Sequence, residues 1–251
     1  MDIIAKQKST FSGIPRVPTG IFGLDDIIEG GFEKNSLNIV AGETGTGKTL
    51  FAFQFAYMGA YKYNDSSLFI SFEETKGELR RRMGRFGFDI NGIEAKGKFF
   101  LYTYSPKEID KFAEELPQIE TQIKKNKITR VSIDSISTFA LFFESESKKK
   151  DEVITLIDKF RKLDVTVVMS SELKMIPGSG EAEESFSFEH LADSIIALYS
   201  IRKSDVRSLG LEVIKMRGTN HSRKINPMRI LPSGLIVYPD MPFTNPSNQK
   251  Y

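Results

Sequence analysis

The feature that most constrains this chain is the octapeptide at residues 42–49, Gly-Glu-Thr-Gly-Thr-Gly-Lys-Thr. Its spacing is that of a P-loop, in which glycines let backbone N–H groups curl around a phosphate chain without a Cβ in the way. In such a loop Lys48 reaches the β- and γ-phosphate oxygens, and Thr49 places its hydroxyl on Mg²⁺. A β-type run at residues 37–41 precedes the loop, and a helical pattern at residues 50–56 follows it. We therefore predict a nucleoside triphosphate site rather than a chance glycine-rich turn.

The composition is that of an ordinary globular protein, with 251 residues of which 40% are hydrophobic and 27% charged. A formal net charge of +2 gives no strong attraction to nucleic acid or to membranes. The chain has no cysteine and only two histidines, so a metal site would have to be Mg²⁺ on oxygen ligands. The N-terminus is too polar for a signal peptide and no apolar run approaches membrane length. We expect a cytoplasmic protein.

Strand and helix patterns alternate along the first part of the chain, and strand patterns alone follow. The expected strands are residues 37–41, 68–72, 99–102, 130–134, 165–170, 195–199, 211–216, 228–231 and 235–238. The expected helices are residues 22–29, 50–63, 78–86, 106–127 and 151–163, with an irregularity at Pro117.

This order predicts one α/β domain with a mostly parallel central sheet, flanked by helices and finished by β-ribbons. The domain is expected over residues 14–240, after a loose lead-in (1–13) and before a C-terminal tail (241–251). Two polar stretches, residues 142–151 and 174–187, are expected to be mobile loops.

Asp134 ends a hydrophobic strand well after the P-loop, where an acid that serves the metal would sit. Its carboxylate would hold a Mg²⁺-bound water or the Thr49 hydroxyl, because a hard cation needs oxygen ligands. The alternative is an aspartate that caps a strand end. The P-loop in the same chain favours the metal site, with Thr49 and Asp134 as its residues.

Glu73 and Glu74 follow the strand at residues 68–72, at its carboxyl end. Ligands and catalytic groups of open parallel sheets lie beyond the carboxyl ends of strands. One acid there would orient a water and accept its proton in line with the γ-phosphate, and its neighbour would tune it. The alternative is a solvated acidic turn. The predicted catalytic residues are Glu73, Glu74 and Lys48.

Lys215 and Arg217 lie two residues apart on one face of a strand far from the P-loop in sequence. Two cations on one face would neutralise charge that develops on a transferred phosphoryl group. From these residues alone, an exposed basic strand face is the commoner explanation.

Together these stretches resemble the KaiC-like branch of the RecA/RadA ATPase family, from residue 14 to about residue 238. The resemblance is carried by five stretches: Pro18–Asp25, the P-loop with Leu50 and Phe51, Ser71–Thr75, Val131–Ser135 and Lys215–Thr219. KaiC proteins have two such domains in tandem, whereas this chain has one.

The resemblance implies a RecA-like P-loop NTPase fold, with ATP and Mg²⁺ bound between the subunits of a homo-oligomeric ring, most often a hexamer. It makes Glu73 and Glu74 the hydrolytic pair. The implied ATP ligands are Gly42, Glu43, Thr44, Gly45, Thr46, Gly47, Lys48, Thr49 and Leu50. The residues implied to reach the nucleotide of the neighbouring subunit are Lys215, Met216, Arg217, Thr219 and His221.

One position departs from the family. In the autokinase half of KaiC a Ser-Thr pair accepts phosphate, whereas Glu189-His190 stands there in this chain. Glutamate forms no stable phosphate ester, so we expect no self-phosphorylation at this position. The hydrolytic half of KaiC is the better likeness.

We therefore expect a Mg²⁺-dependent, slowly ATP-hydrolysing ring protein whose nucleotide state drives assembly or partner exchange. Two other classes stay open: a RadA-like recombination paralogue that binds single-stranded DNA, and a nucleotide-gated scaffold with negligible turnover. DNA-binding loops should be basic. The second expected loop instead holds Glu181, Glu183, Glu184 and Glu189 against Lys174, and acids balance Lys148, Lys149 and Lys150 in the first. Nucleic acid is thus not favoured, although the arginines Arg80, Arg81, Arg82 and Arg85 offer another surface.

Overall fold

The computed structural model describes residues 13–172, 189–203 and 205–243. Over these residues the chain builds one large sheet in the strand order β11-β10-β9-β8-β3-β7-β6-β4-β5. Its strands are β3 (Leu37–Gly42), β4 (Ser66–Ser71), β5 (Phe99–Thr103), β6 (Ile128–Asp134), β7 (Thr166–Ser171), β8 (Ser194–Lys203), β9 (Val206–Met216), β10 (Asn226–Leu231) and β11 (Gly234–Val237). Strands β5, β4, β6, β7, β3 and β8 run parallel, and β9, β10 and β11 continue the sheet antiparallel.

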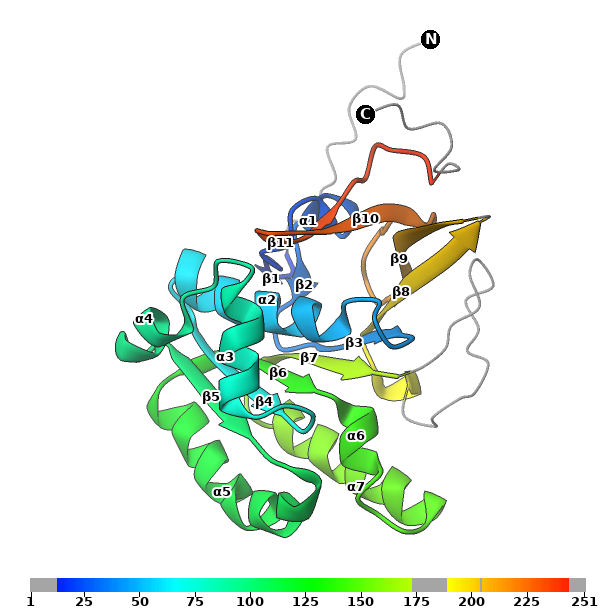
Figure 1. Ribbon diagram of the computed structural model, residues 1–251. Coiled ribbons are helices and arrows are strands. Elements are labelled where there is room, and N and C mark those ends of the chain that lie inside the picture. The colour runs from blue at the N-terminus through cyan, green and yellow to red at the C-terminus, as the bar shows by residue number, and fades with distance from the viewer. Residues whose placement is uncertain (1–12, 173–188, 204, 244–251) are drawn as a thin grey trace.

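Helices cover both faces of the parallel part of the sheet (Figure 1). They are α1 (Leu24–Ile27), α2 (Lys48–Lys62), α3 (Lys76–Gly84), α4 (Ile90–Ala95), η1 (Pro106–Glu108), α5 (Ile109–Lys125), α6 (Ile136–Ala140), α7 (Glu146–Arg161) and η2 (Glu189–Leu191). Helices α2, α3 and α4 contribute to one buried hydrophobic cluster, and α5, α6 and α7 to the other. Among the described residues, no helix is both long enough and apolar enough to cross a membrane.

The P-loop strand β3 is buried along its whole length because it lies between these two clusters. Ile39 and Ala41 belong to the α5–α7 cluster and Val40 to the α2 cluster. A central parallel strand packed on both faces reads as a continuous apolar run, as this one does. A separate ribbon of β1 (Arg16–Val17) and β2 (Phe32–Glu33) flanks the sheet.

A buried arginine holds α2 against β6. Arg130 is 1% exposed, and its guanidinium donates to Asp65 Oδ2 (2.7 Å) and to the carbonyl oxygen of Pro18 (2.6 Å). The same group lies 4.9 Å from the centre of the Phe55 ring. Gly59 on α2 makes room for it, since a Cβ there would lie 2.3 Å from Arg130 Cδ. This ion pair fixes the helix that carries the P-loop lysine.

The predicted α/β fold is confirmed, with shifted element ends and with longer strands β8 and β9. The predicted loop at residues 142–151 is wrong, because α7 already begins at Glu146. Ser145 caps this helix by accepting a hydrogen bond from the Lys148 amide (3.2 Å), so the lysine run is helical. Helix α5 runs through Pro117 as one helix. The other predicted loop, residues 174–187, lies outside the described residues.

Candidate functional site

The P-loop connects the carboxyl end of β3 to the first turn of α2, as the strand–loop–helix pattern predicts. A Cβ at Gly42 would lie 2.5 Å from the Leu198 carbonyl oxygen and 2.8 Å from Thr46 Oγ1, so only glycine fits there. Gly47 has φ +103°, a backbone conformation that favours glycine. The Thr46 hydroxyl donates to the Glu43 carbonyl (2.7 Å) and tightens the turn. The N-terminus of α2 is thereby open to an anion.

Lys48 is 7% exposed and comes from the first turn of α2. Its Nζ donates to the Glu43 carbonyl oxygen (3.0 Å) and lies 3.9 Å from Glu172 Oε1. Burial lowers the pKa of Lys48, and the nearby carboxylates, that of Glu172 first, oppose this shift. The ammonium therefore lies in a pocket that favours an anionic partner.

Asp134 lies at the end of β6, beside the beginning of α2. Its Oδ1 accepts hydrogen bonds from the Thr49 hydroxyl (3.2 Å) and from the Ser170 hydroxyl (2.6 Å). Its Oδ2 is buried and has no hydrogen-bond partner among the described residues. Burial, and next the charge of Glu73, raise the pKa of Asp134 from 3.8 to about 7. A buried carboxylate oxygen without a donor, beside a P-loop hydroxyl, fits the oxygen ligands that Mg²⁺ prefers.

The two glutamates lie in the turn after β4, which ends at Ser71, and their side chains have different partners. The backbone N–H groups of both donate to Ser71 Oγ (3.2 and 3.0 Å), which fixes the turn. Glu73 lines the pocket and its Oε1 accepts from the Thr138 hydroxyl (3.0 Å). Glu74 instead forms an ion pair with Arg82. Burial raises the pKa of Glu74, and the Arg82 charge opposes that shift.

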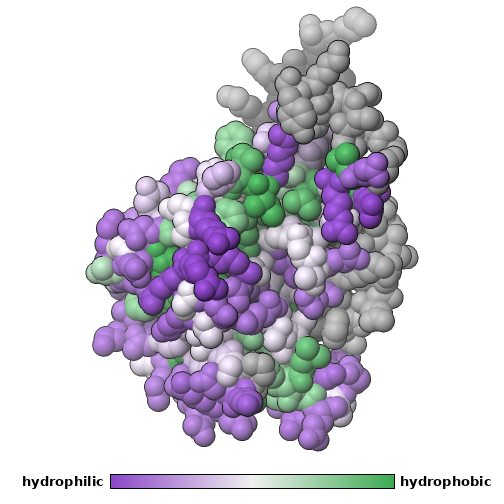
Figure 2. Space-filling view, viewed as in Figure 1, coloured by the Kyte–Doolittle hydropathy of each residue, from purple (hydrophilic) through white to green (hydrophobic). Residues whose placement is uncertain are grey.

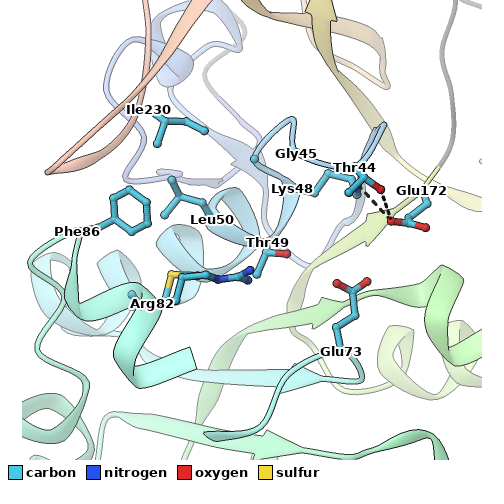
Figure 3. A pocket seen from close by; sticks show the side chains of 12 residues that line it. Thr44, Gly45, Lys48, Thr49, Leu50, Glu73, Arg82, Phe86, Glu172 and Ile230 are labelled. Carbon is cyan, nitrogen blue, oxygen red and sulfur yellow. Dashed lines mark hydrogen bonds and ion pairs between the residues drawn. The ribbon is translucent and has the colours of Figure 1, made fainter. Parts of the chain in front are cut away.

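Lys48, Thr49 and Glu73 line one pocket at the carboxyl ends of the parallel strands (Figure 3). Glu73 and Glu172 point toward Lys48 from one side, and an apolar wall of Leu50, Phe86 and Ile230 lies on the other. Figure 2 shows the matching surface, hydrophobic beside the β10–β11 ribbon and strongly hydrophilic over α3. A polar half next to an apolar half suits a ligand with a phosphate chain and a flat, weakly polar ring.

Lys215 and Arg217 lie together, because the Lys215 Nζ (3.4 Å) and an Arg217 guanidinium nitrogen (3.2 Å) both donate to the His190 carbonyl oxygen. They lie toward the amino ends of the parallel strands, whereas the P-loop lies at their carboxyl ends. The end of β9 pairs with the beginning of β8, which pairs with the beginning of β3. Through Ile195, Lys215 is level with Ile39, about 10 Å along β3 before Gly42 and two strands away from it, and Arg217 lies farther still, level with Leu37. These cations are therefore too far from the P-loop of their own chain to contact phosphates there.

The remaining residues implied to act in trans differ in how far their side chains are exposed. Met216 is 8% exposed and packs in the hydrophobic core, so its side chain is not presented to a neighbour. The Thr219 hydroxyl accepts from an Arg16 guanidinium nitrogen (2.8 Å). His221 Nδ1 lies 2.9 Å from the carbonyl oxygen of Ser222. Thr219 and His221 are half-buried near Arg217, on the same edge of the sheet.

The sequence analysis missed four residues that contact the predicted site: Ser170, Thr138, Arg82 in its pairing with Glu74, and Glu172. For Glu172 a signal existed, because it directly follows the buried strand β7 as Asp134 ends β6. Ser170 and Thr138 carry no comparable signal, since hydroxyl residues occur in any buried strand or helix cap.

A DNA-binding paralogue should have basic side chains in both expected loops, and the structure describes only the first of these loops. Residues 142–145 of the first expected loop form turns, and residues 146–151 form the beginning of α7, where Lys149 pairs with Glu146 (2.6 Å). On α3, Arg80 pairs with Glu94 (2.6 Å) and Arg82 with Glu74. Part of the basic surface is thus already neutralised by neighbouring carboxylates. The second loop lies outside the described residues.

A family model described as "ATPase: KaiC" matches residues 17–241. The circadian clock oscillator protein KaiC of Parathermosynechococcus lividus is 32% identical over 238 residues, which cover 92% of this chain and 44% of that protein. KaiC of Synechococcus elongatus is 30% identical, over 93% of this chain and 46% of that protein. This chain thus spans less than half the length of these relatives. The crystal structure of a KaiC-like protein from Pyrococcus horikoshii OT3 matches with a TM-score of 0.81 and 34% identity, over 90% of this chain and 100% of that one.

Proposed function

This chain belongs to the KaiC ATPase family, and from that premise we propose that it binds Mg²⁺-ATP at the P-loop and hydrolyses it slowly. The nucleotide lies between subunits of a homo-oligomeric ring, a hexamer, and its state drives assembly or partner exchange. The observation that carries the proposal is the contact of Thr49 and Ser170 with Asp134, whose second oxygen is buried and has no hydrogen-bond partner in the described part of the chain.

The residues that contact the phosphate chain, the metal and the attacking water each have a role in this proposal. The P-loop amides and Lys48 bind the β- and γ-phosphates. Thr49 and Asp134 would hold Mg²⁺, which when bound neutralises phosphate charge. Glu73 orients the attacking water and accepts its proton, since its carboxylate lines the pocket. Glu74 tunes this site from outside, because its charge is engaged by Arg82.

Lys215 and Arg217 complete the site of a neighbouring subunit. Their distance from the P-loop of their own chain supports this assignment, as does their joint position at one exposed edge. Cations there would stabilise negative charge that develops on the transferred phosphoryl group. Thr219 and His221 lie at the same edge, and Met216 contributes through its backbone alone.

Binding and assembly are tested first. Calorimetric titration with a non-hydrolysable ATP analogue should show binding that requires Mg²⁺ and is abolished in Lys48→Ala. Light scattering should show the mass of a ring, and Mg²⁺-ATP should either be required for that ring to form or stabilise it. A chain that binds no nucleotide under these conditions, or that stays a monomer with nucleotide bound, refutes the proposal.

Sharing of the site between subunits is tested by mixing variants. Lys48→Ala and Arg217→Ala should each be inactive alone, yet mixed rings should regain part of the phosphate release. In a mixed ring the intact P-loop of one subunit meets the intact Arg217 of the next. Arg207→Ala, which removes an exposed cation at the far end of β9, is the matched control and should retain activity. No recovery on mixing would exclude action in trans.

A further inference from the structure

Glu172 is a residue of the pocket to which the roles above assign no function. It directly follows β7, and its backbone N–H donates to Ser137 Oγ (2.9 Å). Its side chain extends over the P-loop, where Oε1 accepts from the Thr44 hydroxyl (3.2 Å) and lies 3.9 Å from Lys48 Nζ (Figure 3). One carboxylate oxygen therefore contacts two residues of the phosphate-binding loop.

The contact with Lys48 is one that a phosphate oxygen would make, because the P-loop lysine reaches the β- and γ-phosphates. Thr44, whose hydroxyl donates to the same carboxylate oxygen, lines the same pocket. A carboxylate and a phosphate are both anionic oxygen acceptors, so they compete for the Lys48 ammonium. Among the carboxylates that act on Lys48, Glu172 has the largest effect.

Glu172 is also free enough to leave. Its side chain is 48% exposed, whereas that of Lys48 is 8% exposed. The lysine is therefore fixed and the carboxylate can rotate into water at modest cost. An arriving anion would replace Glu172 at the same ammonium.

We propose that Glu172 is an internal competitor of the terminal phosphate, which occupies Lys48 in the nucleotide-free protein and is displaced when a triphosphate binds. This inference rests on the proposed nucleotide site. A diphosphate brings less negative charge to Lys48 than a triphosphate does, so Glu172 opposes the triphosphate more. Glu172 thus sets the ratio of triphosphate to diphosphate affinity, and its return to Lys48 favours release of the cleaved phosphate.

The test compares Glu172→Gln with the wild type by calorimetric titration, using ADP and a non-hydrolysable ATP analogue, each with Mg²⁺. The amide keeps the acceptor for Thr44 and removes the charge. Triphosphate affinity should rise about three- to tenfold, a modest gain because Glu172 is half-exposed. ADP affinity should rise about twofold or less. The gain should shrink at high salt, as screening of an exposed charge requires.

Glu120→Gln is the matched control. Glu120 on α5 lies 3.9 Å from Lys159 on α7, the same separation as in the Glu172–Lys48 pair, but on the other face of the sheet. Its removal should leave both affinities unchanged. An unchanged or lowered triphosphate-to-diphosphate ratio in Glu172→Gln overturns the inference, and a lowered one would make Glu172 a group that assists binding. A wild type that binds neither nucleotide refutes the proposed function itself, and the inference with it.

Discussion

Asp134→Asn should make the nucleotide-free protein more stable at alkaline pH while it removes Mg²⁺-dependent ATP binding. The substitution keeps the size of the side chain and an acceptor for Ser170 and Thr49. It removes the charge of a buried carboxylate whose second oxygen accepts no hydrogen bond from the residues that the structure describes. The negative charge of Asp134 therefore destabilises the folded, nucleotide-free protein, and the same charge is the one that would bind Mg²⁺.

The magnitude follows from the pKa of Asp134, raised from 3.8 to about 7 in the folded protein. An acid with a raised pKa stabilises the fold fully below its unfolded pKa, and loses that stabilisation as pH rises through its folded pKa. Between these values the folded state binds more protons, so stability falls across about pH 4 to 7. Relative to low pH, the Asp134 carboxyl therefore lowers the free energy of unfolding by about 1.5 kcal/mol at pH 5 and by about 4 kcal/mol at pH 8. The variant should therefore gain about 2–3 kcal/mol relative to wild type between pH 5 and pH 8.

Urea unfolding of both proteins at these two pH values, without Mg²⁺ or nucleotide, measures this difference. If the amide nitrogen takes the place of the oxygen Oδ2, the variant loses about 1–3 kcal/mol, and that loss is the same at both pH values. Added Mg²⁺-ATP should stabilise the wild type and not the variant. A stability difference that does not change with pH, or that favours the wild type more at pH 8, would refute the reasoning.

Three further predictions follow from the contacts described. Glu73→Gln should lower phosphate release by about 10²–10⁴-fold with nucleotide affinity nearly unchanged, whereas Glu74→Gln should lower it by about tenfold or less, in single-turnover assays; equal losses would contradict the division of roles. Gly59→Ala should destabilise the fold by about 2–4 kcal/mol in urea unfolding because its Cβ would meet the buried Arg130, while Gly77→Ala, with open space around it, should be neutral or slightly stabilising. Filter binding of single-stranded DNA should be weak and should show no steep salt dependence; tight, salt-sensitive binding would revive the recombination class.

Much of the site was readable in the sequence because its parts are local motifs at the ends of predictable strands. The P-loop combines a strand, glycines and a helix within one stretch, so residues 42–49 were predicted as a phosphate-binding loop without tertiary information. Asp134 and the pair Glu73 and Glu74 were predicted because carboxyl ends of parallel strands share one edge. The helix predicted over residues 151–163 begins earlier, at Glu146, because Ser145 caps it, and the polar, lysine-rich composition of residues 142–151 does not reveal that cap.

Contacts between distant segments were decided by the tertiary structure alone. Hydrophobic periodicity identifies a strand and its buried faces, but it does not state which strands become neighbours. The order β8-β3-β7-β6 brings Ser170 to Asp134 and Glu172 to Lys48, and it puts Lys215 and Arg217 at the far edge from their own P-loop. The sequence by itself determined the kind of site, because backbone conformation and ligand chemistry are local. Which charges meet there was decided by strand order, because that depends on how the whole core packs.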